Sequence, residues 1–168
     1  LSRTIDFLEK NKRKSILMGI VPSLFSFGKL FPKKLNHTIV METGGMKNLT
    51  DQITRKEIHQ KLKDFFGVDS IHSEYGMTEL LSQGYSAKNG IFRNPPWMKI
   101  FTYELNNPFK RTAIGKVGRL NIIDLANQES CSFISTDDIG RSFNDSSYEV
   151  LGRLDGADLR GCNLLFSQ

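Results

Sequence analysis

Hydrophobic residues recur at helical spacing in two segments of the first part of the chain. Residues 4–14 carry apolar side chains near one face and charges opposite, which predicts a helix. The same spacing returns in residues 51–66. Thr50 or Asp51 is positioned to cap this second helix, and Gly67 to end it.

Two short apolar runs, residues 37–41 and 68–72, indicate buried strands on either side of the second helix. Each run leads into a glycine-containing turn, at residues 42–45 and 74–76. A strand–loop–helix–strand–loop order is typical of a parallel α/β sheet. Ligands bind at the carboxyl ends of such strands, so these two turns are the candidate binding loops.

The pattern changes near residue 90 to strand-like stretches separated by loops rich in Asn, Asp, Gly and Pro. The predicted strands span residues 98–104, 116–125, 130–135 and 148–154. We therefore predict an α/β (α+β) fold in which a partial parallel α/β layer precedes a smaller, mostly antiparallel β subdomain. The expected limits are 1–90 for the first part, 91–155 for the second and 156–168 for a hinge and C-terminal tail.

Composition narrows the class of protein. The 168 residues are 39% hydrophobic and 24% charged, which excludes disorder and a collagen-like structure. The longest apolar region, residues 16–31, is interrupted by Pro22 and Lys29, so we expect a fatty or core segment and no membrane span. Two cysteines are too few for a disulfide framework or a zinc site, which favours a reduced, cytoplasmic setting.

Charge is uneven along the chain. Residues 1–63 carry 13 Lys and Arg against 5 Asp and Glu, whereas residues 64–168 carry 10 against 13. The basic part is either a solvated surface or a positive wall facing an anionic ligand or partner. Nucleic acid is not expected, because the basic residues are not interleaved with aromatic ones on a recognition helix.

The segment 74–79, Glu-Tyr-Gly-Met-Thr-Glu, follows a predicted strand and carries several groups suited to a nucleotide. The ring of Tyr75 can lie flat against a purine while Gly76 turns the chain. Thr78 and the first amides of a following helix can bind phosphate, and Glu79 can hold Mg²⁺. The alternative is a simple helix cap.

Three further short motifs also have a purely structural interpretation. Asp138, in segment 135–140, could clamp two ribose hydroxyls, hold a metal or merely form an Asx-turn. Arg153, in Gly-Arg-Leu-Asp at 152–155, offers a fork of donors to phosphate or ribose, or a surface ion pair. Gly44-Gly45 alone indicates only a turn.

In this order and spacing, the four motifs resemble those of the adenylate-forming (AMP-forming) acyl-activating superfamily. The superfamily's Tyr-Gly-x-Thr-Glu motif is complete, and its Thr-Gly-Asp motif appears with Asp in the glycine position. The matching positions are Tyr75, Gly76, Thr78 and Glu79; Thr136, Asp137 and Asp138; Gly152, Arg153 and Asp155; and Gly44 with Gly45, where the family lines the adenine pocket. The resemblance implies the α/β and β layers of the large domain of these enzymes.

A narrower set of segments resembles the acyl-protein synthetases, the long-chain-fatty-acid–luciferin-component ligases of bacterial bioluminescence. These segments are residues 73–83, 94–98, 123–127 and 159–164. The resemblance implies that a fatty carboxylate reacts with ATP and Mg²⁺ to give acyl-AMP, and that a cysteine then takes the acyl group as a thioester. A partner acyl reductase then reduces this acyl group.

The resemblance also implies roles for individual residues. Tyr75 would stack on adenine, Thr78 would bind the α-phosphate, Glu79 would serve the metal, Asp138 the ribose hydroxyls and Arg153 the ribose or phosphate; Gly44, Gly45, Glu74 and Gly76 would complete the nucleotide site.

Cys162 is the position that matches the acyl-accepting cysteine of acyl-protein synthetases. Gly161 favours movement and Arg160 favours the thiolate; an inert terminal residue is the alternative. Cys131, in a strand-like pattern, is expected to be packed.

One departure from the superfamily is plain in the sequence. A Ser/Thr/Gly-rich phosphate loop ending in lysine, which the superfamily carries upstream of the Gly-Gly turn, is absent from these 168 residues. We therefore expect the chain to be the C-terminal half of an enzyme. Two alternatives stay open: an acyl-CoA ligase resembling phenylacetate-CoA ligase, and a non-catalytic nucleotide-binding or docking fragment.

Overall fold

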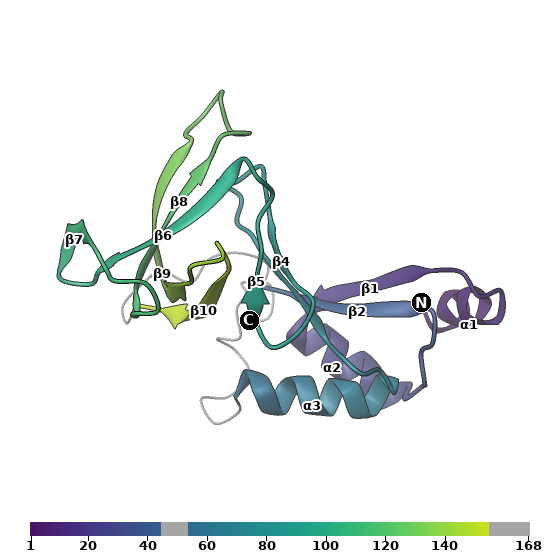
Figure 1. Ribbon diagram of the computed structural model, residues 1–168. Helices are drawn as coiled ribbons and strands as arrows, with labels where there is room; N and C mark the ends of the chain where they lie inside the picture. Colours follow the sequence, from purple (N-terminus) through teal and green to yellow (C-terminus); the bar gives the residue numbers. More distant parts are fainter. Residues whose placement is uncertain (45–53, 155–168) are drawn as a thin grey trace, which may run out of the picture. The chain divides into compact units, whose positions relative to one another are not determined.

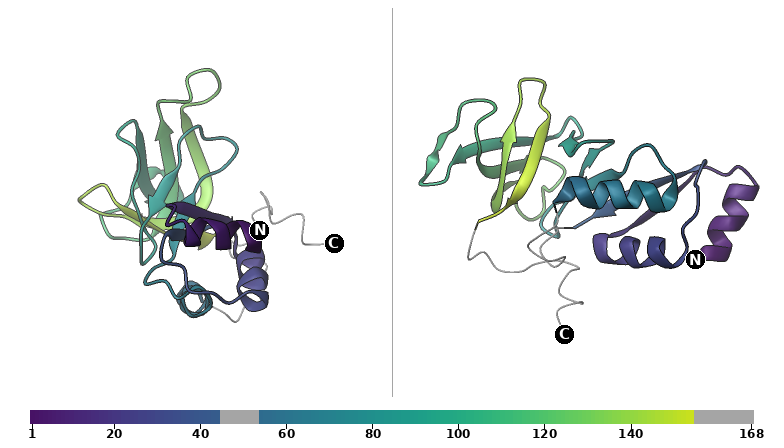
Figure 2. Two further views of the ribbon diagram at one scale, coloured as in Figure 1. Left: turned by 90° about the vertical axis from the view of Figure 1, so that its right-hand side faces the viewer. Right: turned by 90° about the horizontal axis from the view of Figure 1, so that it is seen from below.

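The computed structural model describes residues 1–44 and 54–154, which form two compact units (Figures 1 and 2). The first unit holds the described residues of 1–73 together with 87–89, and the second holds 74–86 and 90–154. The chain passes from one to the other between Ser73 and Glu74. The domain limits proposed from the sequence, with a change near residue 90, stay a prediction.

The first unit is an α/β layer. Its elements are α1 (Ser2–Lys10), β1 (Ser15–Ile20), α2 (Val21–Leu30), β2 (Thr38–Thr43), α3 (Arg55–Phe66) and the first two residues of β3 (His72–Tyr75). The other two residues of β3 and all of β4 (Gly84–Ser86) belong to the second unit. The sheet order is β1-β2-β3-β4, and β1 and β2 run parallel from the pair Ser15–Thr38 to the pair Ile20–Thr43. The predicted parallel α/β layer is thus confirmed.

The second unit contains a six-stranded sheet. Its strands are β5 (Ile91–Phe92), β6 (Met98–Glu104), β7 (Asn107–Arg111), β8 (Gly118–Asp124), β9 (Phe133–Ser142) and β10 (Tyr148–Arg153), in the order β5-β10-β9-β8-β6-β7. All of these neighbours pair antiparallel. The predicted antiparallel part is therefore also confirmed, and β6 has the bounds that the sequence predicted.

The apolar region at residues 16–31 forms two elements that the sequence pattern did not separate, β1 and α2. Pro22 does not interrupt this region: it lies in the first turn of α2, where the missing N–H costs nothing. The first helix is shorter than predicted, because Asn11 caps it and Lys12 takes a positive φ of 52°. Residues of this region are part of the buried core, which is one of the two roles that we expected for it.

The cap of α3 lies later than expected. Thr54 is the N-cap: its hydroxyl accepts from the backbone N–H of Glu57, whose carboxylate accepts from the backbone N–H of Thr54. Thr50 and Asp51 lie outside the described residues. Gly67 ends the helix with φ 58°, in the left-handed region that glycine favours, as predicted.

The second predicted strand is shifted along the chain. Residues 68–72 were expected to be extended, whereas β3 spans His72–Tyr75. Residues 74 and 75 therefore belong to the strand itself, and the turn begins only at Gly76. Apolar character alone misplaced the strand because β3 is built mostly of polar residues, of which Ser73 is buried.

The core of the first unit lies between the sheet and the helices α2 and α3, which cover one side of β1 and β2 (Figure 1). Leu17 and Val40 point to this side and are buried. Ile16, Met18 and Ile39 point to the other side and are 60%, 46% and 42% exposed. Parallel sheets usually have both faces covered. The face that carries Ile16, Met18 and Ile39 is therefore unusually apolar for a sheet face that is exposed.

The core of the second unit is partly aromatic. Its buried residues are Tyr75, Leu80, Phe92, Met98, Ile100, Leu120, Ile122 and Tyr148. Phe92 and Tyr148 stack with ring centroids 5.4 Å apart. In the part of the chain that the structure describes, no helix is long and apolar enough to span a membrane.

Candidate functional site

Three of the predicted site residues, far apart in the sequence, converge within the second unit. The hydroxyl of Tyr75, at the end of β3, donates to Oδ2 of Asp138 in β9 over 2.7 Å. Arg153 is the register partner of Asp138 on β10, and its Nε lies 3.5 Å from Oδ1 of Asp138. Its Nη2 lies 3.7 Å from Asp137. We call these residues, Tyr75, Asp138 and Arg153, the triad.

Arg153 makes loose contacts within the triad. Its Nε is buried without a hydrogen-bond partner, since 3.5 Å to Asp138 is longer than a formed hydrogen bond. Its side chain is 23% exposed. The guanidinium therefore retains donor capacity that a phosphate or hydroxyl oxygen could use.

Tyr75 is held rigidly at the other end of the triad. Its ring is only 9% exposed and makes edge contacts with Phe92 and Tyr148, at centroid distances of 6.1 and 5.9 Å. Burial, and then the charge of Asp138, raise the pKa of Tyr75 well above its usual value. The phenol is thus neutral and a donor at neutral pH. Its stacking on adenine stays a prediction.

Asp138 does not lie in a turn, so the Asx-turn interpretation is wrong. β9 runs through residues 133–142, and residues 136–138 bulge from it, because Ser135 pairs with Asn121 and Ile139 with Arg119 of β8. The Thr136 hydroxyl donates to the Leu120 carbonyl and accepts from the Asp138 N–H. Bulges redirect side chains next to active sites, and this one presents both carboxylates of the motif.

Thr78 and Glu79 lie in an exposed turn rather than at the start of a helix. The described residues 76–83 contain no helix, so the predicted binding of phosphate by helix amides is wrong. The Thr78 hydroxyl donates to Oε2 of Glu79 over 3.1 Å. An exposed carboxylate beside a hydroxyl fits the oxygen ligands that Mg²⁺ takes when substrate phosphates supply the rest.

A buried hydrogen-bond network that the sequence motifs did not reveal fixes this turn. Asp124, fully buried at the end of β8, accepts from the backbone N–H groups of Leu81 and Ser82 and from the Ser82 hydroxyl. The indole N–H of Trp97 donates to the same hydroxyl over 2.9 Å. Asn127 donates to the Glu79 carbonyl over 2.8 Å. The narrower resemblance was the signal in the sequence that could have pointed to this network. Its matching segments include Asp124, Trp97 and Asn127.

The remaining predicted residues are dispersed. Glu74 is half-buried in β3, and Gly76 is exposed just after it. Gly44 follows β2 with φ 81°, in the left-handed region. Gly45 and Cys162 lie outside the described residues. Among the described residues, no cluster of three His, Cys, Asp or Glu could hold a metal by itself.

Cys131 is exposed, which corrects the expectation that it is packed. It lies just before β9 rather than inside a strand, because the predicted strand 130–135 begins only at Phe133. Its Sγ donates to the Phe133 carbonyl over 3.0 Å. Any test of thioester formation must therefore distinguish the two cysteines by separate variants.

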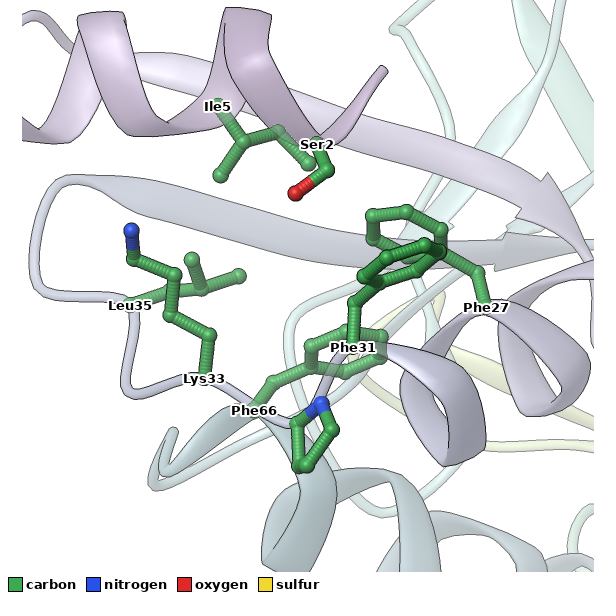
Figure 3. A pocket seen from close by; sticks show the side chains of 8 residues that line it. Ser2, Ile5, Phe27, Phe31, Lys33, Leu35 and Phe66 are labelled. Carbon is green, nitrogen blue, oxygen red and sulfur yellow. The ribbon is translucent and has the colours of Figure 1, made fainter.

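The sequence motifs did not indicate two further features of the first unit. Glu42 at the end of β2 is 1% exposed, with His59 Nε2 at 3.4 Å and Arg55 Nε at 3.8 Å. An apolar pocket of about 330 Å³ opens between the helices (Figure 3). Its lining is Ser2, Ile5, Phe27, Phe31, Pro32, Lys33, Leu35 and Phe66.

Comparison with solved structures supports the fold. The chain is similar to ATP-bound MatB from Rhodopseudomonas palustris (TM-score 0.66, 15% identity, 91% of this chain and 33% of that one). It is also similar to the AMP complex of O-succinylbenzoate coenzyme A synthetase from Bacillus subtilis (0.62, 16%, 90% and 34%). Coronafacic acid ligase from Pectobacterium brasiliense gives 0.58 and 20%, over 90% of this chain and 32% of that one.

Comparison with protein-family profiles and with curated protein sequences gives no match. The chain spans about a third of the length of the structures that it resembles. At identities of 15–20%, this likeness concerns the fold alone. The chain accordingly has the mixed α/β layer and separate antiparallel sheet found in the matching third of these synthetases and ligases.

Proposed function

We propose that this chain is the C-terminal part of an ATP-dependent, AMP-forming acid–thiol ligase of the acyl-protein synthetase type. The observation that carries the proposal is the triad: a buried phenol, a carboxylate and an arginine, contributed by three strands, at the residues that match the adenylate motifs. ATP-bound and AMP-bound proteins among the similar structures support a nucleotide as the ligand.

In the first half-reaction, a carboxylate oxygen of a fatty acid or similar acid attacks the α-phosphorus of ATP. The bond from that phosphorus to the bridging oxygen breaks, and pyrophosphate leaves. Asp138 would accept hydrogen bonds from ribose hydroxyls while Tyr75 fixes its orientation. Arg153 would donate to ribose or phosphate oxygens. Fixed groups of this kind lower the barrier by positioning and by matching charge.

Thr78 and Glu79 would face the phosphates in this scheme, with Gly44, Gly45, Glu74 and Gly76 completing the nucleotide site. Thr78 would donate to an α-phosphate oxygen. Glu79 would hold Mg²⁺, which neutralises phosphate charge when bound. The exposed position of both side chains supports these roles, because a ligand can reach them.

In the second half-reaction we propose Cys162 as the acyl acceptor. Its thiolate would attack the carbonyl carbon of the acyl-AMP, forming a thioester and expelling AMP. The thioester would then pass to a partner acyl reductase in the cytoplasm. Neither a nucleic acid nor a membrane span enters this scheme.

Two measurements test the proposal. Calorimetry of the purified chain with AMP and ATP should show saturable binding, and its absence would favour the docking fragment. The full-length enzyme should then be given radiolabelled fatty acid and ATP. We expect hydroxylamine-sensitive label on the protein that Cys162→Ser abolishes and Cys131→Ser, the matched control, retains.

The opposite pattern would make Cys131 the acceptor. An acyl-CoA ligase of the phenylacetate-CoA ligase type is the second candidate, favoured by the likeness to a coenzyme A synthetase. In that case the labelled product would be acyl-CoA, formed only with added coenzyme A and unaffected by Cys162→Ser.

A further inference from the structure

We infer that Asp124 is a positioning residue for the turn that carries Thr78 and Glu79, and that Asn127 assists it. The inference rests on the proposed function only for the ligand that the turn would bind. Whether Asp124 and Asn127 hold the turn in place can be tested without that function. Neither residue would touch the nucleotide. Both act through the backbone directly after Thr78 and Glu79, from the Glu79 carbonyl to the Ser82 amide, so their effect would be confined to the phosphate and metal end of the site.

Asp124 binds the segment that follows the turn. Its Oδ2 accepts from the N–H groups of Leu81 at 3.0 Å and Ser82 at 2.8 Å. Its Oδ1 accepts from the Ser82 hydroxyl at 2.8 Å and from the Ala126 N–H at 3.2 Å. Four donors thus surround one carboxylate that is fully buried. Both oxygens accept hydrogen bonds, so an asparagine, whose amide nitrogen only donates, cannot satisfy the same four donors.

Asn127 binds the turn from its other end. Its Nδ2 donates to the carbonyl of Glu79 at 2.8 Å and to that of Cys131 at 3.0 Å. Its Oδ1 accepts from the Ser130 hydroxyl. Asn127 is 5% exposed, and these bonds set the direction of its amide. The backbone from residue 79 to residue 82 is therefore fixed at its first carbonyl and at its last two amides.

This arrangement matters because the turn is not part of any regular secondary structure. Residues 76–83 form neither helix nor strand, and Thr78 and Glu79 point outward as exposed side chains. Leu80 is buried and its N–H donates to the Met77 carbonyl at 3.1 Å, but this bond closes the turn on itself and does not tie it to another element. Groups that bind phosphate or metal lose their effect when displaced by about 1 Å. The bonds from Asp124 and Asn127 supply the required restraint.

The experiment compares the purified chain with Asp124→Asn, which keeps the shape and loses the charge. Ser82→Ala is the milder second variant, and Glu104→Gln, in a surface pair with Lys110, is the matched control. Amide hydrogen exchange of residues 77–84 and of β8 is measured first. Affinities for adenosine, which has no phosphate, and for ATP with and without Mg²⁺ follow.

We expect exchange at residues 77–84 to rise about tenfold or more in Asp124→Asn, less in Ser82→Ala and not in Glu104→Gln, with β8 unchanged. The gain in ATP affinity on adding Mg²⁺ should fall about tenfold, while adenosine affinity should stay the same. A general loss of structure would instead change β8 exchange and adenosine affinity together.

Unchanged exchange at residues 77–84 in both variants would overturn the inference, as would an equal loss of adenosine affinity and of the Mg²⁺ effect. Failure of the wild-type chain to bind any nucleotide would overturn the proposed function, while the exchange data would still decide whether Asp124 holds the turn. If Asp124→Asn does not fold, Ser82→Ala decides by the same two readings.

Discussion

Tyr75 and Asp138 lie 63 positions apart in the sequence, and a hydrogen bond of 2.7 Å joins the phenol of one to the carboxylate of the other. The bond links the end of β3 to the bulge of β9. It orients one carboxylate oxygen toward the core and leaves Oδ1 on the side of Arg153. The ribose-binding group proposed for the site is thus fixed before any ligand arrives.

Tyr75→Phe tests the contribution of this bond to stability. The ring packing is retained and only the hydroxyl is lost, so we expect the free energy of unfolding to fall by about 1.5–3 kcal/mol, the range for hydrogen bonds to charged groups. Urea unfolding measures it. Tyr103→Phe is the matched control, because its hydroxyl accepts only an exposed bond from Arg111. Equal losses in both variants would contradict the prediction.

Asp138→Ala tests ligand binding. Loss of a charge-assisted contact to the ribose should weaken AMP binding about ten- to a hundredfold. Asp137→Ala is the control: the neighbouring carboxylate lies in the same bulge, 3.7 Å from Arg153, and is 43% exposed. Calorimetry gives both affinities. If Asp137→Ala weakens binding as much as Asp138→Ala in folded protein, the carboxylates act only through the charge of the bulge.

Stability should fall steeply at alkaline pH. Burial raises the pKa of Tyr148, and burial with the charge of Asp138 raises that of Tyr75, both above the ordinary value of 10. Above pH 10 the unfolded chain loses protons that the folded chain keeps, so the free energy of unfolding decreases with rising pH. Urea midpoints between about pH 9 and pH 11 measure the slope.

Tyr148→Phe should reduce this slope without loss of stability at pH 7. The Tyr148 hydroxyl is buried without a hydrogen-bond partner, so its removal also removes an unsatisfied polar group. An unchanged slope in this variant would show that other groups cause the alkaline unfolding.

Gly140→Ala tests the pairing of β9 with β10. A Cβ at Gly140 would lie 2.1 Å from the backbone carbonyl of Glu149, and a backbone neighbour cannot move aside as a side chain can. We expect a loss of about 2–3 kcal/mol or more in urea unfolding. At Gly115 a Cβ meets nothing, and only its positive φ of 77° opposes alanine, so Gly115→Ala should cost about 1–2 kcal/mol. The reverse order would refute the close-approach argument.

The sequence predicted the elements whose signals are local. Helix α3 ends at Gly67 as expected, and β6 follows its alternating pattern from Met98 to Glu104. β1 and α2 could not be separated, because a short parallel strand and the helix after it form one apolar run around Pro22. The sequence also predicted that turns after β2 and β3 would carry site residues.

The pattern of hydrophobic and polar residues could not predict contacts between segments that are distant in the sequence. The bulge at residues 136–138 depends on which residues of β8 face it, so its aspartates resembled a turn. The bond from Leu81 to Asp124 spans 43 positions, and no local spacing indicates it. Motif resemblance singled out the three members of the triad one by one, but only the fold brings them together.

Trp97 is the single tryptophan of the sequence, and its indole N–H donates to the Ser82 hydroxyl that Asp124 also holds. The indole is 51% exposed, so its emission depends on both solvent and this bond. The protein consequently carries an intrinsic fluorophore on the backbone segment next to Thr78 and Glu79. Movements of this segment can therefore be followed in stopped-flow time courses without any introduced label.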